Sequence, residues 1–182
     1  MRKAGLHQLG ICLRSNSTIG VSRMRLSEPV NICLEPIGTV VSTRSETTDD
    51  YWDKEQCFVE LLESCGDESL LGLSEFSHAE IIFYMDQVDP GGIENCARHP
   101  RGREDWPKTG IFAQRAKNRT NQIGITVCKI SRLTDNRLYI EGLDAVDGTP
   151  VLDIKPWVQE FGPRGPIRQP TWMTELMKNY WA

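Results

Sequence analysis

The sequence predicts an all-β fold, an antiparallel sandwich or a small barrel, with one short helix near the C-terminus. Short β-type runs recur between turn residues from about residue 37 to residue 157. No long apolar repeat with a helical period separates most of these runs. The one apolar stripe with helical spacing lies close to the chain end. Many short strands without helices between them are typical of an antiparallel sandwich or barrel.

Seven strands are expected in chain order. The first, residues 37–43, is rich in β-branched side chains and follows Pro36. The other six are expected at residues 57–62, 79–85, 111–114, 123–129, 138–143 and 151–157. The third is apolar on both faces, which predicts a central strand. In the fifth, Ile123, Ile125 and Val127 share one face, and smaller residues share the other.

Two further elements complete the expected fold. Asp147-Gly148 separates the last two strands and predicts a hairpin turn, because glycine accepts a positive φ at little cost. Pro170 can start the C-terminal helix. Its apolar stripe, which is expected to pack against the barrel or another subunit, consists of Trp172, Met173, Leu176, Met177 and Tyr180.

The chain of 182 residues divides into three predicted parts. Residues 35–168 are the barrel domain, and residues 169–182 are the helical segment. Residues 1–34 are a basic extension that we expect to be poorly ordered. Its first 27 residues hold five bases, four serines and no acid, which fits either an organelle transit peptide or an over-extended start before Met24.

Composition excludes several classes of protein. The chain is 39% hydrophobic and 25% charged, and no apolar run is long enough to span a membrane as a helix. The six cysteines form no C-x-x-C pair and there are three histidines, so we expect reduced thiols, no metal site and a cytoplasmic location.

Charge is unevenly distributed along the chain, although the formal net charge is only −4. Glu46 to Asp89 contains thirteen acids and one base, whereas Arg98 to Arg119 contains seven bases and two acids. A local positive field of this kind suits a phosphate-bearing partner. Alternatively, the basic segment pairs with the acidic segment across the fold.

Motifs for nucleotide-binding loops, serine hydrolases and zinc proteases are missing, but three stretches can carry chemistry. Gly110 to Gly124 presents basic and amide side chains at a strand end. Leu143 to Pro150 places two carboxylates in a turn. Phe76 to Gln87 is a buried strand that begins near a histidine, His78, and ends in Asp86-Gln87.

Four blocks of sequence together resemble one known family. They are Phe76-Ser77-His78, Gly110 to Ala113 with Arg115, Asn121 to Gly124, and Leu143 to Pro156. These blocks closely resemble the TsaA-like (YaeB/TrmO) family of S-adenosylmethionine-dependent tRNA methyltransferases, from about Pro36 to Gly165. The resemblance implies a closed or nearly closed β-barrel, a homodimer, and methylation of the exocyclic nitrogen of a threonylcarbamoyl-adenosine beside the tRNA anticodon.

The resemblance also implies which residues contact S-adenosylmethionine. They are Asp86, Gln87, Arg115, Ile125, Asp144, Ala145, Val146 and Asp147. Trp52 or Tyr84 can offer an aromatic face to the cationic sulfonium. Asp86, Asp144 or Asp147 can accept the proton that the nitrogen loses. The bases from Arg98 to Arg119 would then face the tRNA backbone.

The chain departs from the family pattern in three places, one of which is the segment Trp172 to Trp181 that replaces the long C-terminal extension of some relatives. Thr48 to Asp53 stands where bacterial relatives carry Pro-Arg-Gln, and Arg119-Thr-Asn-Gln122 stands where relatives read Arg-Pro-Asn-Pro. Two alternatives therefore stay open. One is a methyltransferase of the same fold that acts on a small molecule. The other is a non-catalytic module that binds S-adenosylmethionine.

Overall fold

The computed structural model describes residues 31–53, 55–66 and 68–182. Residues Pro36–Ala182 form one unit of the chain, and the fold described below lies within it. Nearly all of the predicted N-terminal extension falls outside the described residues. The predicted domain boundaries stay predictions.

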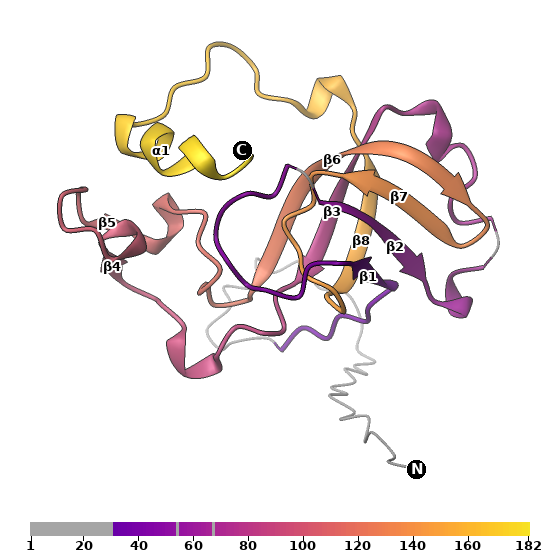
Figure 1. Ribbon diagram of the computed structural model, residues 1–182, viewed down its shortest axis with the longest axis horizontal. Coiled ribbons are helices and arrows are strands. Elements are labelled where there is room, and N and C mark those ends of the chain that lie inside the picture. The colour runs from indigo at the N-terminus through magenta and orange to yellow at the C-terminus, as the bar shows by residue number, and fades with distance from the viewer. Residues whose placement is uncertain (1–30, 54, 67) are drawn as a thin grey trace, which may run out of the picture. The chain divides into compact units, whose positions relative to one another are not determined.

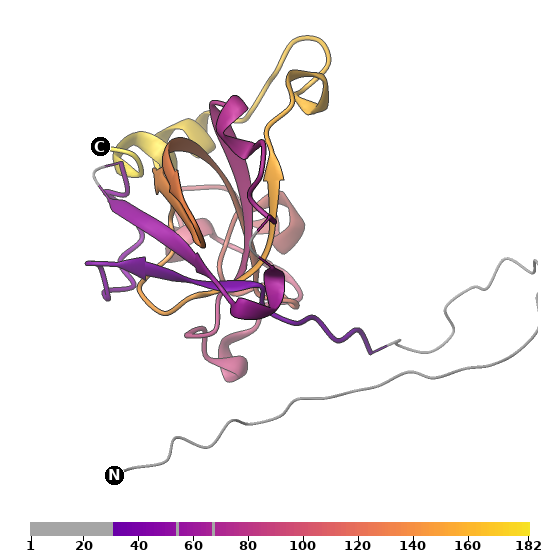
Figure 2. The ribbon, with the colours of Figure 1, turned by 90° about the vertical axis from the view of Figure 1, so that its right-hand side faces the viewer.

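Six antiparallel strands close into a barrel in the order β1-β2-β7-β6-β3-β8, with β8 pairing back onto β1 (Figures 1 and 2). The strands are β1 Gly38–Ser42, β2 Gln56–Leu61, β3 His78–Tyr84, β6 Ile123–Thr134, β7 Arg137–Glu141 and β8 Pro150–Pro156. The predicted all-β barrel is therefore confirmed. Closure pairs every strand on both sides, so the barrel has no open edge.

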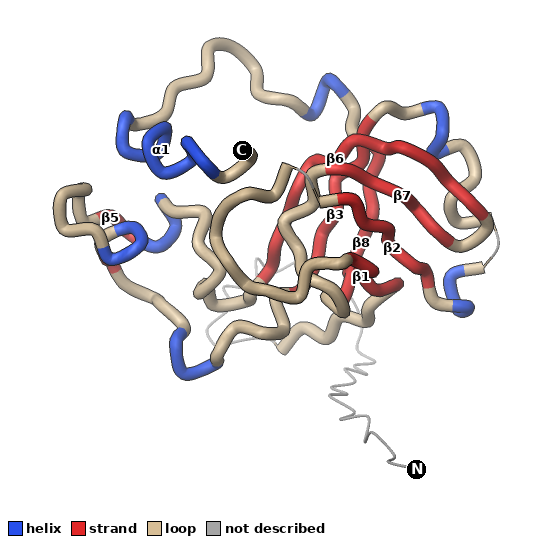
Figure 3. The backbone as a smooth tube through the Cα atoms, viewed as in Figure 1, coloured by secondary structure: helices blue, strands red, loops and turns tan. Residues whose placement is uncertain are grey.

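The remaining elements are short and lie outside the barrel wall (Figure 3). A two-stranded sheet joins β4 Ala97–Arg98 to β5 Thr109–Gly110. The helix α1 Thr171–Leu176 is confirmed near the chain end. The 3-10 turns are η1 Glu63–Cys65, η2 Leu73–Glu75, η3 Pro90–Gly92, η4 Pro100–Gly102, η5 Ile111–Ala113, η6 Gln159–Phe161 and η7 Met177–Asn179.

Alternating side chains fill the barrel interior. On β2, Cys57 and Val59 point inward and are buried, and the same alternation holds for Leu138 and Ile140 on β7. Burial raises the pKa of the Cys57 thiol to about 12 and also raises that of Cys128. These thiols are therefore neutral and unreactive near neutral pH.

The orientation of β6 follows from one close contact inside the barrel. Gly124 lies directly opposite Phe83 of β3, and a Cβ at Gly124 would come within 2.2 Å of the Phe83 ring. The small residues of β6 therefore face inward, where Phe83 needs the space. Ile123 and Ile125 consequently face outward and are partly exposed. This outward apolar row becomes part of the candidate site.

We expect Gly124→Ala to lower the free energy of unfolding by about 3 kcal/mol, because overpacking forces the Phe83 ring or the strands to shift. Gly110→Ala is the matched control, since a Cβ there meets no atom within 4 Å and its φ is −59°. Urea unfolding of both variants measures the difference. Equal unfolding midpoints would contradict this packing argument.

Three local predictions are wrong. The strand expected at residues 123–129 continues to Thr134 as β6. Residues 111–114 do not form a strand; Ile111 and Gln114 are buried and the two residues between them are exposed, a spacing of three that suits the 3-10 turn observed there. Asp147-Gly148 does reverse the chain, with φ +81° at Gly148. However, β7 and β8 are not paired with each other, so this turn closes no hairpin.

Candidate functional site

A cavity of about 1160 Å³ lies against the outer face of β3 and β6. Figure 1 shows this side of the barrel facing α1 and the β4–β5 sheet. The cavity is also lined by the loop that follows β1, by residues 112–122, by the segment before β8 and by the C-terminal segment, residues 171–182. Arg98, Pro100 and Arg101 line it as well, so six segments that are separate in the sequence meet around one space.

Most of the predicted cofactor contacts line this cavity. They are Trp52, Asp86, Gln87, Arg115, Ile125, Asp144, Ala145 and Val146. Asp147 does not line it. The Asp147 carboxylate instead accepts a hydrogen bond from the backbone N–H of Ser42 at 3.0 Å, and the Asp147 N–H donates to the carbonyl of Arg44 at 2.8 Å. In this structure Asp147 ties the turn before β8 to the end of β1.

Asp144 is held by two hydroxyl donors. Thr126 of β6 donates to one carboxylate oxygen and Tyr180 donates to the other. Burial and the Asp144 carboxylate raise the pKa of Tyr180, so its hydroxyl keeps its proton and remains a donor. Tyr180 is further fixed because its carbonyl accepts from the N–H of Trp52 at 2.9 Å. The C-terminal segment therefore fastens Asp144 in place.

Arg115 ties the loop after η5 to the barrel. Its Nη2 donates to the backbone carbonyl of Ile125 at 2.7 Å, which brings together two of the predicted cofactor contacts. Because Ile125 lies in a paired strand, the guanidinium is anchored on a rigid support. The arrangement leaves an exposed cationic side chain on the cavity wall.

Trp52 is better suited to donate a hydrogen bond to a ligand than to offer it an aromatic face. The guanidinium carbon of Arg44 lies 3.5 Å from the ring centroid, so a cation already occupies one face of this indole. The Nε1 of Trp52 and the Nε of Arg98 are the buried side-chain atoms without a hydrogen-bond partner in the described part of the chain. Both residues line the cavity. Since buried polar atoms normally have partners, a ligand with hydrogen-bond acceptors fits this site.

Gln122 organises the Asp86-Gln87 turn, a role that the sequence reasoning did not assign. Its side chain accepts from the Tyr84 hydroxyl at 3.0 Å and donates to the carbonyls of Met85 at 3.3 Å and Val88 at 3.0 Å. Its φ is +51°, a conformation closed to proline. The sequence could have indicated this role, because Gln122 stands where the Arg-Pro-Asn-Pro pattern has a proline.

Tyr180 and Arg44 were also missed. Tyr180 was noted only as part of an apolar stripe, and the stripe does line the cavity through Trp172, Met173, Leu176 and Met177. Trp172 packs on Trp106, with ring centroids 6.4 Å apart. No sequence signal marks Arg44, because its partners are mainly backbone carbonyls.

The basic segment is partly neutralised by the acidic one. Arg101 forms a two-pronged pair with the Asp50 carboxylate at 2.9 and 2.7 Å, and Lys117 pairs with Asp49 at 2.8 Å. Asp50 raises the pKa of Arg101 through this hydrogen-bonded pairing. The structure thus realises the alternative in which the two segments pair across the fold, at least for these two bases.

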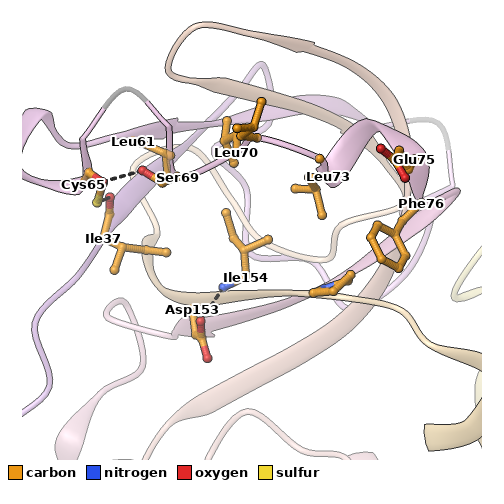
Figure 4. Close-up of a pocket in the computed structure, with 13 residues that line it drawn as sticks. Ile37, Leu61, Cys65, Ser69, Leu70, Leu73, Glu75, Phe76, Asp153 and Ile154 are labelled. Atoms are coloured by element: carbon orange, nitrogen blue, oxygen red, sulfur yellow. Dashed lines mark hydrogen bonds between the residues drawn. The ribbon is translucent and has the colours of Figure 1, made fainter.

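A second cavity of about 630 Å³ lies near β8 (Figure 4). Half of its labelled lining residues are aliphatic, including Ile37, Leu61, Leu70 and Ile154. None of the predicted site residues lines it. In the described residues, no group of histidine, cysteine and acidic side chains can hold a metal ion, and no helix is long and apolar enough to cross a membrane.

Comparison with protein families gives a match over most of the chain. Residues 46–162 match the family model of the tRNA-methyltransferase O N-terminal domain. The matched residues include β3 and β6, the two barrel strands that line the larger cavity. They do not include the C-terminal segment.

Individual relatives agree with this match. The human tRNA (adenine(37)-N6)-methyltransferase is 34% identical over 113 residues, which cover 62% of this chain and 25% of the human protein. A probable S-adenosyl-L-methionine-binding protein of Pyrococcus abyssi is 35% identical over 149 residues, covering 77% of this chain and 76% of its own length. The chain spans about a quarter of the length of the mammalian relatives it matches.

Solved structures show the same fold. A crystal structure of TrmO from P. aeruginosa is similar with a TM-score of 0.65 and 28% sequence identity. The similarity covers 80% of this chain and 63% of the TrmO chain.

Proposed function

The chain belongs to the tRNA-methyltransferase O family, and on this premise we propose that it is an S-adenosylmethionine-dependent methyltransferase that acts on the N6 nitrogen of an adenosine in tRNA. In its finer form, the proposal is that this adenosine is a threonylcarbamoyl-adenosine beside the anticodon. The observation that carries the proposal is the gathering of Asp86, Arg115 and Asp144, from three distant segments, around one large cavity.

The cavity suits S-adenosylmethionine chemically. The cofactor carries a carboxylate, ribose hydroxyls and adenine nitrogens, all of which accept hydrogen bonds, and the cavity wall holds the two unpartnered donors of Trp52 and Arg98. Exposed Arg115 can meet the carboxylate. Asp86 or Asp144 can accept from the ribose hydroxyls or from the ammonium group. The residues present therefore fit the cofactor.

Catalysis in this cavity would rest mainly on positioning. S-adenosylmethionine supplies an electrophilic methyl group from its sulfonium. The barrel wall and the C-terminal segment would hold the acceptor nitrogen next to that methyl and exclude water. One nitrogen–carbon bond forms, one sulfur–carbon bond breaks, and the proton of the nitrogen must leave.

The proton acceptor is proposed to be a carboxylate of the cavity wall. Asp86 and Asp144 line the cavity, whereas Asp147 does not. Asp144 is the better positioned of the two, because the Thr126 and Tyr180 hydroxyls fix both of its oxygens.

A small-molecule acceptor is the second candidate, and one observation favours it. The ion pairs of Arg101 with Asp50 and of Lys117 with Asp49 occupy cations that a tRNA backbone would use. The homodimer and the cytoplasmic location stay predictions that rest on the resemblance and the composition.

Calorimetric titration with S-adenosylmethionine tests the cofactor site. We expect saturable binding that weakens about 10- to 100-fold in Arg115→Ala and in Asp144→Ala, because each variant removes a charged hydrogen-bonding group. Arg137→Ala is the matched control, since Arg137 pairs with Glu60 and does not line the cavity. Absence of binding by the folded wild-type chain, with and without tRNA, would refute the proposal.

Methyl transfer then tests the acceptor. Radiolabelled cofactor is supplied with tRNA that carries threonylcarbamoyl-adenosine and with the same tRNA lacking that modification. Transfer to the modified tRNA alone supports the finer proposal. If both tRNAs are methylated, the finer proposal is wrong and only the coarser one stands, namely that the acceptor is an adenosine of tRNA.

A further inference from the structure

An aromatic ring stands exposed on the wall of the larger cavity. The Phe112 side chain is 78% exposed, although phenylalanine gains most from burial. Trp181 also lines the cavity, but it is 40% exposed and its ring meets that of Tyr180 edge-on at 4.9 Å. Phe112 therefore offers the freer ring face of the two.

The exposure of Phe112 does not come from a loose backbone. Its neighbour Ile111 is 2% exposed, and the Ile111 N–H donates to the Cys96 carbonyl at 3.1 Å. Gln114, 5% exposed, donates from its side chain to the carbonyls of Arg98 and Thr109 at 3.2 and 3.0 Å. Buried anchors on both sides thus hold η5 in place and present the ring between them.

A cation accompanies the ring. The guanidinium carbon of Arg119 lies over one face of the Phe112 ring, 5.5 Å from its centroid, and its Nη1 donates to the Gln114 carbonyl at 2.9 Å, so a base would stack on the opposite face. Arg119 also lines the cavity. A ring with one face covered by a fixed cation and the other open matches a nucleotide, whose base can stack on the open face and whose phosphate is negative.

The size of the cavity leaves room for a second ligand. Ligand pockets usually measure about 300–1,000 Å³. At about 1160 Å³, this cavity can take the cofactor together with an unstacked base. An acceptor nitrogen inside an RNA can react only after its base leaves the stack.

We infer that Phe112 is the stacking platform for the acceptor adenine, with Arg119 beside it as the partner of the nucleotide's phosphate. This inference rests on the proposed function, because it takes the acceptor to be a base of single-stranded RNA. Phe112 acts by positioning the base and takes no part in bond making.

A double-mutant cycle on RNA binding tests the inference. The probes are a labelled anticodon stem-loop RNA with adenosine next to the anticodon and the same RNA with an abasic residue there. Removing the base should weaken binding to the wild-type protein about 5- to 150-fold, the usual range for one stacked base. Phe112→Leu should weaken binding of the intact RNA by a similar factor. The variant should bind the intact RNA and the abasic RNA with equal affinity. Phe112→Tyr should restore wild-type behaviour.

Other outcomes overturn the inference. Independent, additive effects of the two changes would mean that the ring and the base do not touch, and wild-type binding by Phe112→Leu would mean that the ring is not needed. A lower oligomeric mass of Phe112→Leu in sedimentation would assign the ring to a second copy of this chain. Calorimetry with S-adenosylmethionine distinguishes failure of the proposed function from failure of this inference. Absence of cofactor binding by the wild-type chain refutes the proposed function, whereas the RNA cycle tests only the role of Phe112.

Discussion

Arg44→Ala is expected to lower the free energy of unfolding by about 3–5 kcal/mol, because it removes several hydrogen bonds from a charged donor that contribute about 1.5–3 kcal/mol each. The Arg44 side chain is 10% exposed and gathers the loop after β1 around itself. It donates to the carbonyls of Thr48, Asp50 and Tyr51 at 3.1, 2.9 and 2.9 Å. It also stacks on Trp52. Without it, these loop carbonyls lose their donor.

The same variant should weaken binding of S-adenosylmethionine, because the loop supplies Trp52 and its neighbours to the cavity wall. Urea unfolding and calorimetry measure the two effects. Arg44→Lys keeps the charge but not the planar fork, so it should recover less than half of the lost stability. Arg137→Ala, at an exposed ion pair, should cost below about 1 kcal/mol. If Arg44→Ala matched Arg137→Ala, the loop would not depend on Arg44.

The strands were predictable because their signal is local. β-Branched runs and alternation placed β1, β2, β3, β7 and β8 within about two residues of their observed bounds. Closure of the barrel was implied by the family resemblance and not by the pattern, since the pairing of Gly38 with Val151 joins residues far apart in the sequence. Periodicity alone also could not show which face of β6 points inward.

The candidate site was predictable where it consists of ionisable side chains at strand ends. Asp86, Arg115 and Asp144 were found in this way together with the resemblance, and all three line one cavity. Asp147 was equally plausible by sequence, but a backbone N–H of Ser42 holds its carboxylate. Gln122 and Arg44 act through backbone carbonyls, which every residue possesses, so no residue pattern identifies their partners.

The Asp49→Asn/Asp50→Asn double variant is expected to bind anticodon stem-loop RNA about 10- to 30-fold more tightly than wild type at 0.1 M salt. The Asp49 carboxylate pairs with Lys117 and the Asp50 carboxylate pairs with Arg101. The Arg101–Asp50 pair is bidentate, the geometry in which arginine also binds a phosphate. The amides release both cations for phosphate contacts. Each added contact to single-stranded RNA steepens the slope of log affinity against log salt by about 0.7.

The control frees two cations away from the cavity. Glu60→Gln/Glu141→Gln releases Arg137 and Lys129 by the same chemistry, and neither base lines the cavity. Net charge changes equally in both double variants, so a general attraction for RNA would affect them alike. Tighter binding and a slope steeper by about 1.4 in the Asp49/Asp50 variant alone would place the RNA backbone on Arg101 and Lys117. An unchanged affinity would separate these bases from RNA and favour the small-molecule acceptor, because the ion pairs would then serve only to close the loop over the cavity.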